Sequence, residues 1–169
     1  MLKKSRIAFL AIAMSASCMS FAEAIKVQSV IPYAESAKIP QKIRTECTKL
    51  GSQLAQFTQE FGKSFGVRIE LTDKLDINEQ GRVLHLEFTD AISKGNAFIG
   101  HQKSTAAHGI LYQDGKKIAE FDVSRDSMGG MFAGYKGSCS VLGRTVKTMG
   151  KDIAQWLKDP KDKAELGDF

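Results

Sequence analysis

Residues 104–124 read "STAAHGILYQDGKKIAEFDVS", in which two apolar flanks surround an Asp-Gly pair. Asp114-Gly115 is a favoured pair for a tight hairpin turn, because both central residues of that turn adopt a positive φ. The apolar residues of the flanks are Ile110, Leu111 and Tyr112 on one side and Ile118, Phe121 and Val123 on the other. The stretch therefore predicts a β-hairpin with antiparallel strands.

Three further strands are predicted before the hairpin. Residues 67–72 ("VRIELT") and 82–90 ("RVLHLEFTD") alternate apolar and polar side chains, as half-buried strands do. Residues 25–31 ("IKVQSVI") are rich in β-branched side chains and end at Pro32, which is typical of a short strand. The glycine-containing residues 91–102 are expected to form a loop.

Two amphipathic helices are predicted from apolar residues that recur at steps of three and four. The first set is Ile43, Cys47, Leu50, Leu54, Phe57 and Phe61, and the second is Cys139, Leu142, Val146, Met149, Ile153 and Trp156. The first helix is expected to begin at Pro40 and to end near Gly62 to Gly66. The second is expected to begin with Ser138 or Ser140 as its cap and to end at Asp159-Pro160.

The order of predicted elements is strand, helix, four strands, helix. This order indicates an α+β fold in which a mostly antiparallel sheet of about five strands carries both helices on one face. We expect one domain over residues 25–158. Residues 159–169 are charged and have no apolar face, and are expected to form a flexible tail.

Residues 1–24 have the features of a cleaved secretory signal. Three cations at positions 3, 4 and 6 precede an apolar core over residues 7–14, and small residues follow. The apolar core is too short to span a bilayer, which needs about 20 apolar residues in a helix. The mature chain is therefore expected in the periplasm, without a transmembrane span.

The sequence offers two cleavage sites and one alternative to simple cleavage. "SFA" (20–22) and "AEA" (22–24) predict cleavage after Ala22 or Ala24. Cys18 follows small residues, as a lipidated cysteine does, although Ser15 stands where lipoprotein signals usually have leucine. A lipid anchor at Cys18 is thus the alternative to a soluble mature chain.

Cys47 and Cys139 are the two cysteines that remain after cleavage. In an oxidising compartment an even pair indicates a disulfide. Both cysteines lie on the apolar stripes of the predicted helices, so both can reach the same core between the helices and the sheet. The sequence therefore predicts a Cys47–Cys139 disulfide that clamps the two helices together.

The charge of the chain argues against binding to nucleic acid. The formal net charge is +5, and removal of residues 1–24 takes away three cations and Glu23, which leaves +3. The basic residues are interleaved with acids and form no stripe that could neutralise many phosphates. No nucleic-acid partner is expected.

Residues 129–139 ("GGMFAGYKGSC") combine glycines with bulky side chains. They lack the Gly-Lys-Ser/Thr ending of a phosphate-binding loop and the G-x-G-x-x-G of a dinucleotide turn. The plain interpretation is a connector into the last helix. The alternative is a contact surface formed by Met131, Phe132 and Tyr135, because loops often carry function.

The sequence contains no recognisable catalytic or metal-binding set. His85, His101 and His108 have none of the short spacings of zinc ligands. The serines include no G-x-S-x-G nucleophile motif, and the acids are scattered. We therefore expect no metal, no cofactor and no assigned catalytic residue.

Three stretches resemble small uncharacterised bacterial envelope proteins and lipoproteins with an α+β domain. They are "HLEFTDAISKGNAFIG" (85–100), "HGILYQDGKKIAEFDVS" (108–124) and "LGRTVKTMGKDIAQWL" (142–157). The similar families include relatives of the curli-secretion lipoprotein and the amino-terminal TolB-like domain. The resemblance implies a role in the envelope without catalysis, and it supplies no catalytic residues.

The signal, the cysteine pair and the missing catalytic set together predict a non-catalytic periplasmic protein that binds an unknown envelope partner or surface. The alternative is a small periplasmic hydrolase whose residues converge from separate strands. A deep pocket that holds His108 or His101 beside an acid would favour the hydrolase. A flat face formed by Met131, Phe132 and Tyr135 would favour binding.

Overall fold

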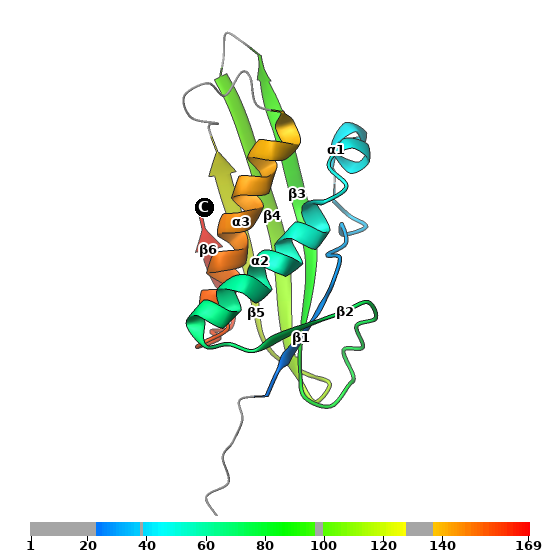
Figure 1. Ribbon diagram of the computed structural model, residues 1–169, viewed down its shortest axis with the longest axis vertical. Coiled ribbons are helices and arrows are strands. Elements are labelled where there is room, and N and C mark those ends of the chain that lie inside the picture. Colours follow the sequence, from blue (N-terminus) through cyan, green and yellow to red (C-terminus); the bar gives the residue numbers. More distant parts are fainter. Residues whose placement is uncertain (1–22, 38, 97–99, 128–136) are drawn as a thin grey trace, which may run out of the picture.

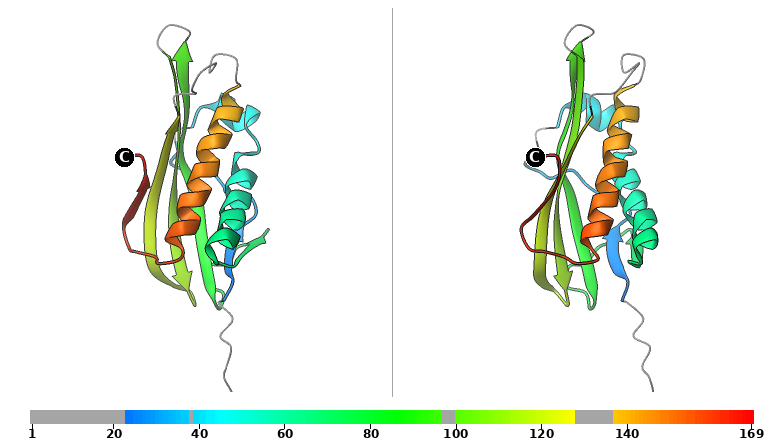
Figure 2. Two further views of the ribbon diagram at one scale, coloured as in Figure 1. Left: turned by 60° about the vertical axis from the view of Figure 1, so that its left-hand side comes forward. Right: turned by 90° about the vertical axis from the view of Figure 1, so that its left-hand side faces the viewer.

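The computed structural model describes residues 23–37, 39–96, 100–127 and 137–169. Within these residues, a six-stranded sheet has the strand order β2-β1-β3-β4-β5-β6. Helices α2 (Leu50–Phe65) and α3 (Ser138–Trp156) lie against one face of the sheet, and the short helix α1 (Gln41–Glu46) lies beyond one end of α2 (Figures 1 and 2). The predicted α+β class, with the helices on one face, is confirmed.

The predicted hairpin forms the centre of the sheet. Strands β4 (Gly100–Gln113) and β5 (Lys116–Ser127) are antiparallel, and the turn residues Asp114 and Gly115 have φ angles of 51° and 77°. The backbone N–H of Gly81 donates a hydrogen bond of 2.8 Å to Asp114 Oδ1, which holds the pKa of that carboxyl below its ordinary value. This bond ties the turn to the residue just before β3.

Strand β3 (Arg82–Asn96) is longer than predicted, and the loop expected over residues 91–102 is wrong. Strand β3 pairs with β4 up to Asn96, and a β-bulge between Phe88 and Asp90 inserts one extra residue. Phe88 and Ala91 are both buried on either side of the bulge. The bulge therefore shifts the inward positions from even to odd numbers, which breaks the alternation on which the prediction relied.

The sheet is mixed, with six strands, so the prediction of about five mostly antiparallel strands fits only in part. Strand β1 (Ile25–Gln28) runs parallel to both β2 (Ile69–Thr72) and β3, and β6 (Ala164–Gly167) runs parallel to β5. Helix α2 connects β1 to β2, and α3 connects β5 to β6. A helical crossover returns the chain in its original direction, so each pair is parallel.

Two segments differ from the predicted elements. The single first helix is divided into α1 and α2, because Cys47 leaves the helical conformation at φ −101° and ψ 47°. Strand β6 lies within residues 159–169, for which the sequence predicted a flexible tail. Its side of the sheet is fastened by Arg125, whose guanidinium bonds Asp152 at 2.7 Å and Asp168 at 2.8 Å.

The core lies between the sheet and helices α2 and α3. Its fully buried side chains include Leu54, Leu84, Leu86, Phe88, Leu111, Phe121, Leu142, Val146, Met149 and Ile153. The two helices approach closely at Gly150, where an added Cβ would lie 2.7 Å from Phe57 Cβ and 2.9 Å from the backbone nitrogen of Thr58. At Gly143, about two turns earlier on α3, the nearest atom would be Gln53 Oε1 at 3.4 Å.

These two glycines predict opposite effects of the same substitution. Gly143→Ala should stabilise the protein by up to about 1 kcal/mol, because alanine is the better helix former and the site has room. Gly150→Ala should destabilise it by about 1–3 kcal/mol, because the new methyl group overpacks the helix crossing. Urea unfolding of the two variants checks this. Equal stability of the variants would contradict the close approach of α2 and α3.

Candidate functional site

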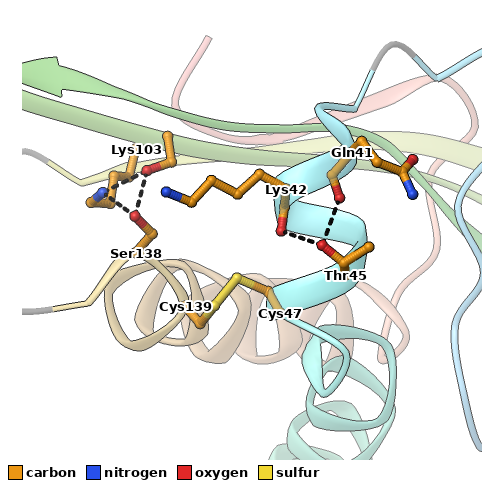
Figure 3. Close-up of a disulfide and its surroundings, with 8 residues drawn as sticks. Gln41, Lys42, Thr45, Cys47, Lys103, Ser138 and Cys139 are labelled. Carbon is orange, nitrogen blue, oxygen red and sulfur yellow. Dashed lines mark hydrogen bonds between the residues drawn. A yellow bond between two sulfur atoms is a disulfide. The ribbon is translucent and has the colours of Figure 1, made fainter.

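A pocket of about 130 Å³ opens where α1, β3 and the first residue of α3 meet. It is lined by Pro40, Lys42, Ile43, Glu46, Cys47, Ser93 and Ser138. Figure 3 shows this region, with Lys42 of α1 extended toward the side of the pocket where Lys103 and Ser138 lie. The lining comes from three parts of the chain that are far apart in sequence, so only the folded chain forms this pocket.

One cysteine of the Cys47–Cys139 disulfide, Cys47, lines the pocket. The two Cα atoms are 5.2 Å apart and the sulfur atoms 1.98 Å apart. Cys47 is the residue that ends α1, and Cys139 lies in the first turn of α3. The disulfide therefore fixes the first turn of α3 beside α1. A second cavity of about 260 Å³ is lined by Glu46, Cys47, Thr48, Lys49, Leu50, Gln53, Cys139 and Ser140.

A buried lysine lies beside the pocket. Lys103 of β4 is 4% exposed, and its Nζ donates hydrogen bonds to Ser93 Oγ at 2.6 Å and to Ser138 Oγ at 3.1 Å. The two serine hydroxyls are themselves joined by a hydrogen bond of 2.9 Å. Ser93, Lys103 and Ser138 thus form one connected group, named here the Lys103 cluster, that joins β3 and β4 to α3.

The strand register explains why Lys103 faces the helices. It pairs with Ser93 across β3 and β4, and it shares the inward face of β4 with Thr105 and Ala107. Thr105 donates a hydrogen bond of 2.8 Å to Thr145 of α3. At the end of β4 that holds Lys103 and Thr105, the layer between sheet and helices is therefore polar. At the other end of the sheet the inward positions hold leucine or phenylalanine, such as Leu111 and Phe121.

Burial lowers the pKa of Lys103 below its ordinary value of 10.5, and no carboxylate among the described residues offsets this effect. A buried ammonium is costly unless charged or polar groups replace its lost hydration. The two hydroxyl oxygens replace part of it. Within the described parts of the chain, the Lys103 amine thus contacts two hydroxyls and no carboxylate.

The hydrogen-bond inventory of the cluster leaves donors in excess. An ammonium only donates, whereas each serine hydroxyl can donate once and accept twice. Lys103 donates to both serines, and one serine donates to the other. Whichever serine donates, the hydrogen of the other is left over, and both serines line the pocket. The cluster is therefore suited to a ligand that accepts hydrogen bonds.

The sequence-predicted residues have different outcomes. The structure joins Cys47 and Cys139 in a disulfide. Met131, Phe132 and Tyr135 lie outside the described residues, so the predicted contact surface stays a prediction. Sequence reasoning missed Lys103, because the expected loop ended just before it and hid its place on the inward face of β4.

His108 is paired with acids and lines neither of the two pockets described above. His108 lies on the sheet face opposite the helices, where Nδ1 is 2.9 Å from Asp122 Oδ1 and Nε2 is 3.7 Å from Glu120 Oε2. His101 belongs to β4 by its backbone pairing, and its side chain is outside the described part of the structure. In the described ranges no three His, Cys, Asp or Glu side chains gather as a metal site requires. No described helix has the length and apolar character of a membrane span.

The comparisons with known proteins give a likeness of fold. No family model matches the chain, and no curated protein matches its sequence. A hypothetical protein from Chlamydia trachomatis is 8% identical with a TM-score of 0.50, over 81% of this chain and 96% of the other. A DUF330 protein from Xanthomonas campestris is 10% identical with a TM-score of 0.50, over 88% and 91%.

A minor lipoprotein from Acinetobacter baumannii is also similar, at 10% identity and a TM-score of 0.46, over 80% of this chain and 92% of the other. At such identities the comparisons show a shared fold alone. The predicted resemblance to small uncharacterised bacterial proteins is confirmed at the level of the fold.

The buried amine predicts a specific pH dependence of stability. Because the folded-state pKa of Lys103 lies below 10.5, the unfolded chain binds more protons between the two pKa values, and stability rises with pH in that window. The free energy of unfolding of wild type relative to Lys103→Met should therefore increase as the pH approaches 10.5. Urea unfolding at a series of pH values measures this difference.

Lys74→Met, at an exposed lysine in a turn, is the matched control and should follow the wild-type profile. Parallel profiles for wild type and Lys103→Met would show that the Lys103 ammonium is solvated in the folded protein, and would contradict the buried cluster.

Proposed function

We propose that the chain is an exported, non-catalytic protein of the bacterial cell envelope that binds a partner there. The observation that carries the proposal is the Cys47–Cys139 disulfide. Structural disulfides persist in oxidising compartments such as the periplasm and are rare in the cytosol. The proposal therefore accounts for a covalent bond that a cytosolic chain would not keep.

The disulfide also contributes to the stability of the fold, and this contribution requires an oxidising compartment. Its cysteines are 92 residues apart in sequence. In the chain-entropy model a loop near 100 residues is worth about 4–5 kcal/mol, against roughly 5–15 kcal/mol for the stability of a whole domain. The folded state is thus expected to depend on oxidation of this pair.

The proposed signal peptide is compatible with the described fold. Strand β1 starts at Ile25, so cleavage after Ala22 or Ala24 leaves every strand complete. The backbone N–H of Ile25 donates a hydrogen bond of 2.8 Å to the carbonyl of Arg68. The mature chain would therefore enter the sheet at or just after its first residue.

We propose Met131, Phe132 and Tyr135 as the partner-contact residues. Their segment leads into Ser138 and Cys139, which the Lys103 cluster and the disulfide hold in place. Aromatic anchors often dominate the energy of interfaces.

One observation favours a second candidate, a small hydrolase with residues from separate strands. Ser93 of β3 and Lys103 of β4 meet Ser138 of α3. In some enzymes a neutral lysine acts as the base for a serine nucleophile, and the lowered pKa of Lys103 is in the direction that this requires. The hydrolase needs Lys103 without its proton, whereas binding needs it charged.

The experiment is in-cell chemical crosslinking of the tagged full-length chain, followed by purification from the periplasm. We expect a mature chain that begins at Glu23 or Ile25, has one disulfide and forms a crosslinked adduct with an envelope component. Phe132→Ser and Tyr135→Ser should reduce the adduct without lowering the melting temperature, because surface changes usually stay within about 0.5 kcal/mol.

Phe169→Ser is the matched control, since Phe169 is a 71% exposed aromatic residue at the other end of the sequence. It should leave the adduct unchanged. A diacylated Cys18 at the amino terminus, or alkylation of both thiols in the folded protein, would contradict the export and disulfide readings. Undiminished adducts in both loop variants would contradict the contact surface.

A further inference from the structure

We propose that the pocket beside the Lys103 cluster binds an oxyanion, either a carboxylate or a phosphate group of a ligand. The inference deepens the proposed function by giving the chemistry of what is bound. It rests on the proposed function only for the cellular compartment in which the chain encounters the anion. Binding of the anion itself needs only the purified folded chain.

The Lys103 cluster has more hydrogen-bond donors than acceptors. Ser93 and Ser138 both line the pocket and both accept a hydrogen bond from Lys103. Their mutual bond uses one hydroxyl hydrogen and leaves the other. A donor that faces a pocket is satisfied by an acceptor, and a charged acceptor makes the stronger bond.

The charged groups around the pocket also favour an anion. The ionisable groups of the described residues at this site are Lys42 and Glu46, which line the pocket, and Lys103 behind the serines. Two cations and one carboxylate leave a charge of +1. The interaction between Lys103 and a bound anion would be little screened, because Lys103 is only 4% exposed.

The first turn of α3 also favours an anion. The cap residue Gly137 has no side chain, and no side chain caps this helix. The first backbone N–H groups of a helix have no partner within the helix and favour negative charge. Ser138 is the first residue of α3 and lines the pocket. An oxyanion at this position would cap the N-terminus of α3 and would also be attracted by the charge of Lys103.

The size of the pocket limits what it can hold. Its volume of about 130 Å³ is close to the volume that roughly four water molecules occupy in the liquid, at about 30 Å³ each. Pockets for drug-sized ligands are typically about 300–1,000 Å³. The pocket therefore fits one anionic group rather than a whole metabolite, and the rest of the ligand would lie outside it.

The test is a ¹⁵N NMR titration of the oxidised mature protein with sodium phosphate and, separately, with sodium acetate at constant ionic strength. We expect saturable shifts of the amide signals of Ser93, Ser138 and Cys139. Ser138→Ala should weaken the apparent affinity about tenfold or more, because it removes a hydrogen bond to a charged group. Lys103→Met should weaken it about as much, because it removes the buried positive charge behind the two serines. Saturation by both anions supports recognition of charge, and saturation by phosphate alone assigns a phosphoryl group.

Lys49→Met is the matched control, since Lys49 lines the neighbouring cavity and lies outside the cluster. It should leave the affinity nearly unchanged. If Lys103→Met does not fold, Ser138→Ala decides the question. Shifts that do not saturate, or that persist unchanged in the folded cluster variants, would overturn the proposal.

Labelling of Ser93 or Ser138 by a fluorophosphonate probe, lost in Lys103→Met, would also overturn it in favour of the hydrolase. Failure of anion binding with intact export and crosslinking would leave the proposed function standing.

Discussion

The Cys47–Cys139 disulfide is the covalent constraint on which one end of this molecule depends. It joins the residue that ends α1 to the first turn of α3. The other end of α3 is held by packing, where Trp156 lies against Phe121 with ring centroids 4.6 Å apart. Near the disulfide the layer between sheet and helix is polar instead, so the covalent bond supplies there what apolar packing supplies elsewhere.

This polar layer contains the Lys103 cluster and borders the proposed anion pocket. A lysine at an inward position of β4 would be destabilising in a purely apolar layer. Here Ser93 reaches Lys103 from the paired strand β3, and Ser138 reaches it from the start of α3, which the disulfide fixes above the sheet. The same placement brings α1 alongside and forms the pocket. At this end of the molecule, polar and charged groups therefore replace apolar packing between sheet and helix. Proteins often depart from apolar packing in this way at sites that bind ligands.

Much of the fold could be predicted from the sequence, and the gaps have physical causes. The Asp114-Gly115 turn and the stripe of α3 are local signals, and both are confirmed. The bulge after Phe88 changes which residues face inward, so the extended strand resembled a loop in the sequence. For that reason the sequence did not predict that Lys103, which pairs with Ser93 beyond the bulge, faces the helices. Strand β6 has only two apolar residues, Ala164 and Leu166, which pack against the core, and it is ordered by pairing with β5. So short an alternation is not a recognisable local signal.

The disulfide holds α3 over Lys103 and so keeps water from its amine. The pKa of the Lys103 amine, measured by NMR in the oxidised protein and again after reduction of the disulfide, tests this dependence. We expect a pKa below 10.5 in the oxidised protein that returns toward 10.5 on reduction, as the first turn of α3 is released. A pKa that is unchanged by reduction, or already at 10.5 in the oxidised protein, would contradict it.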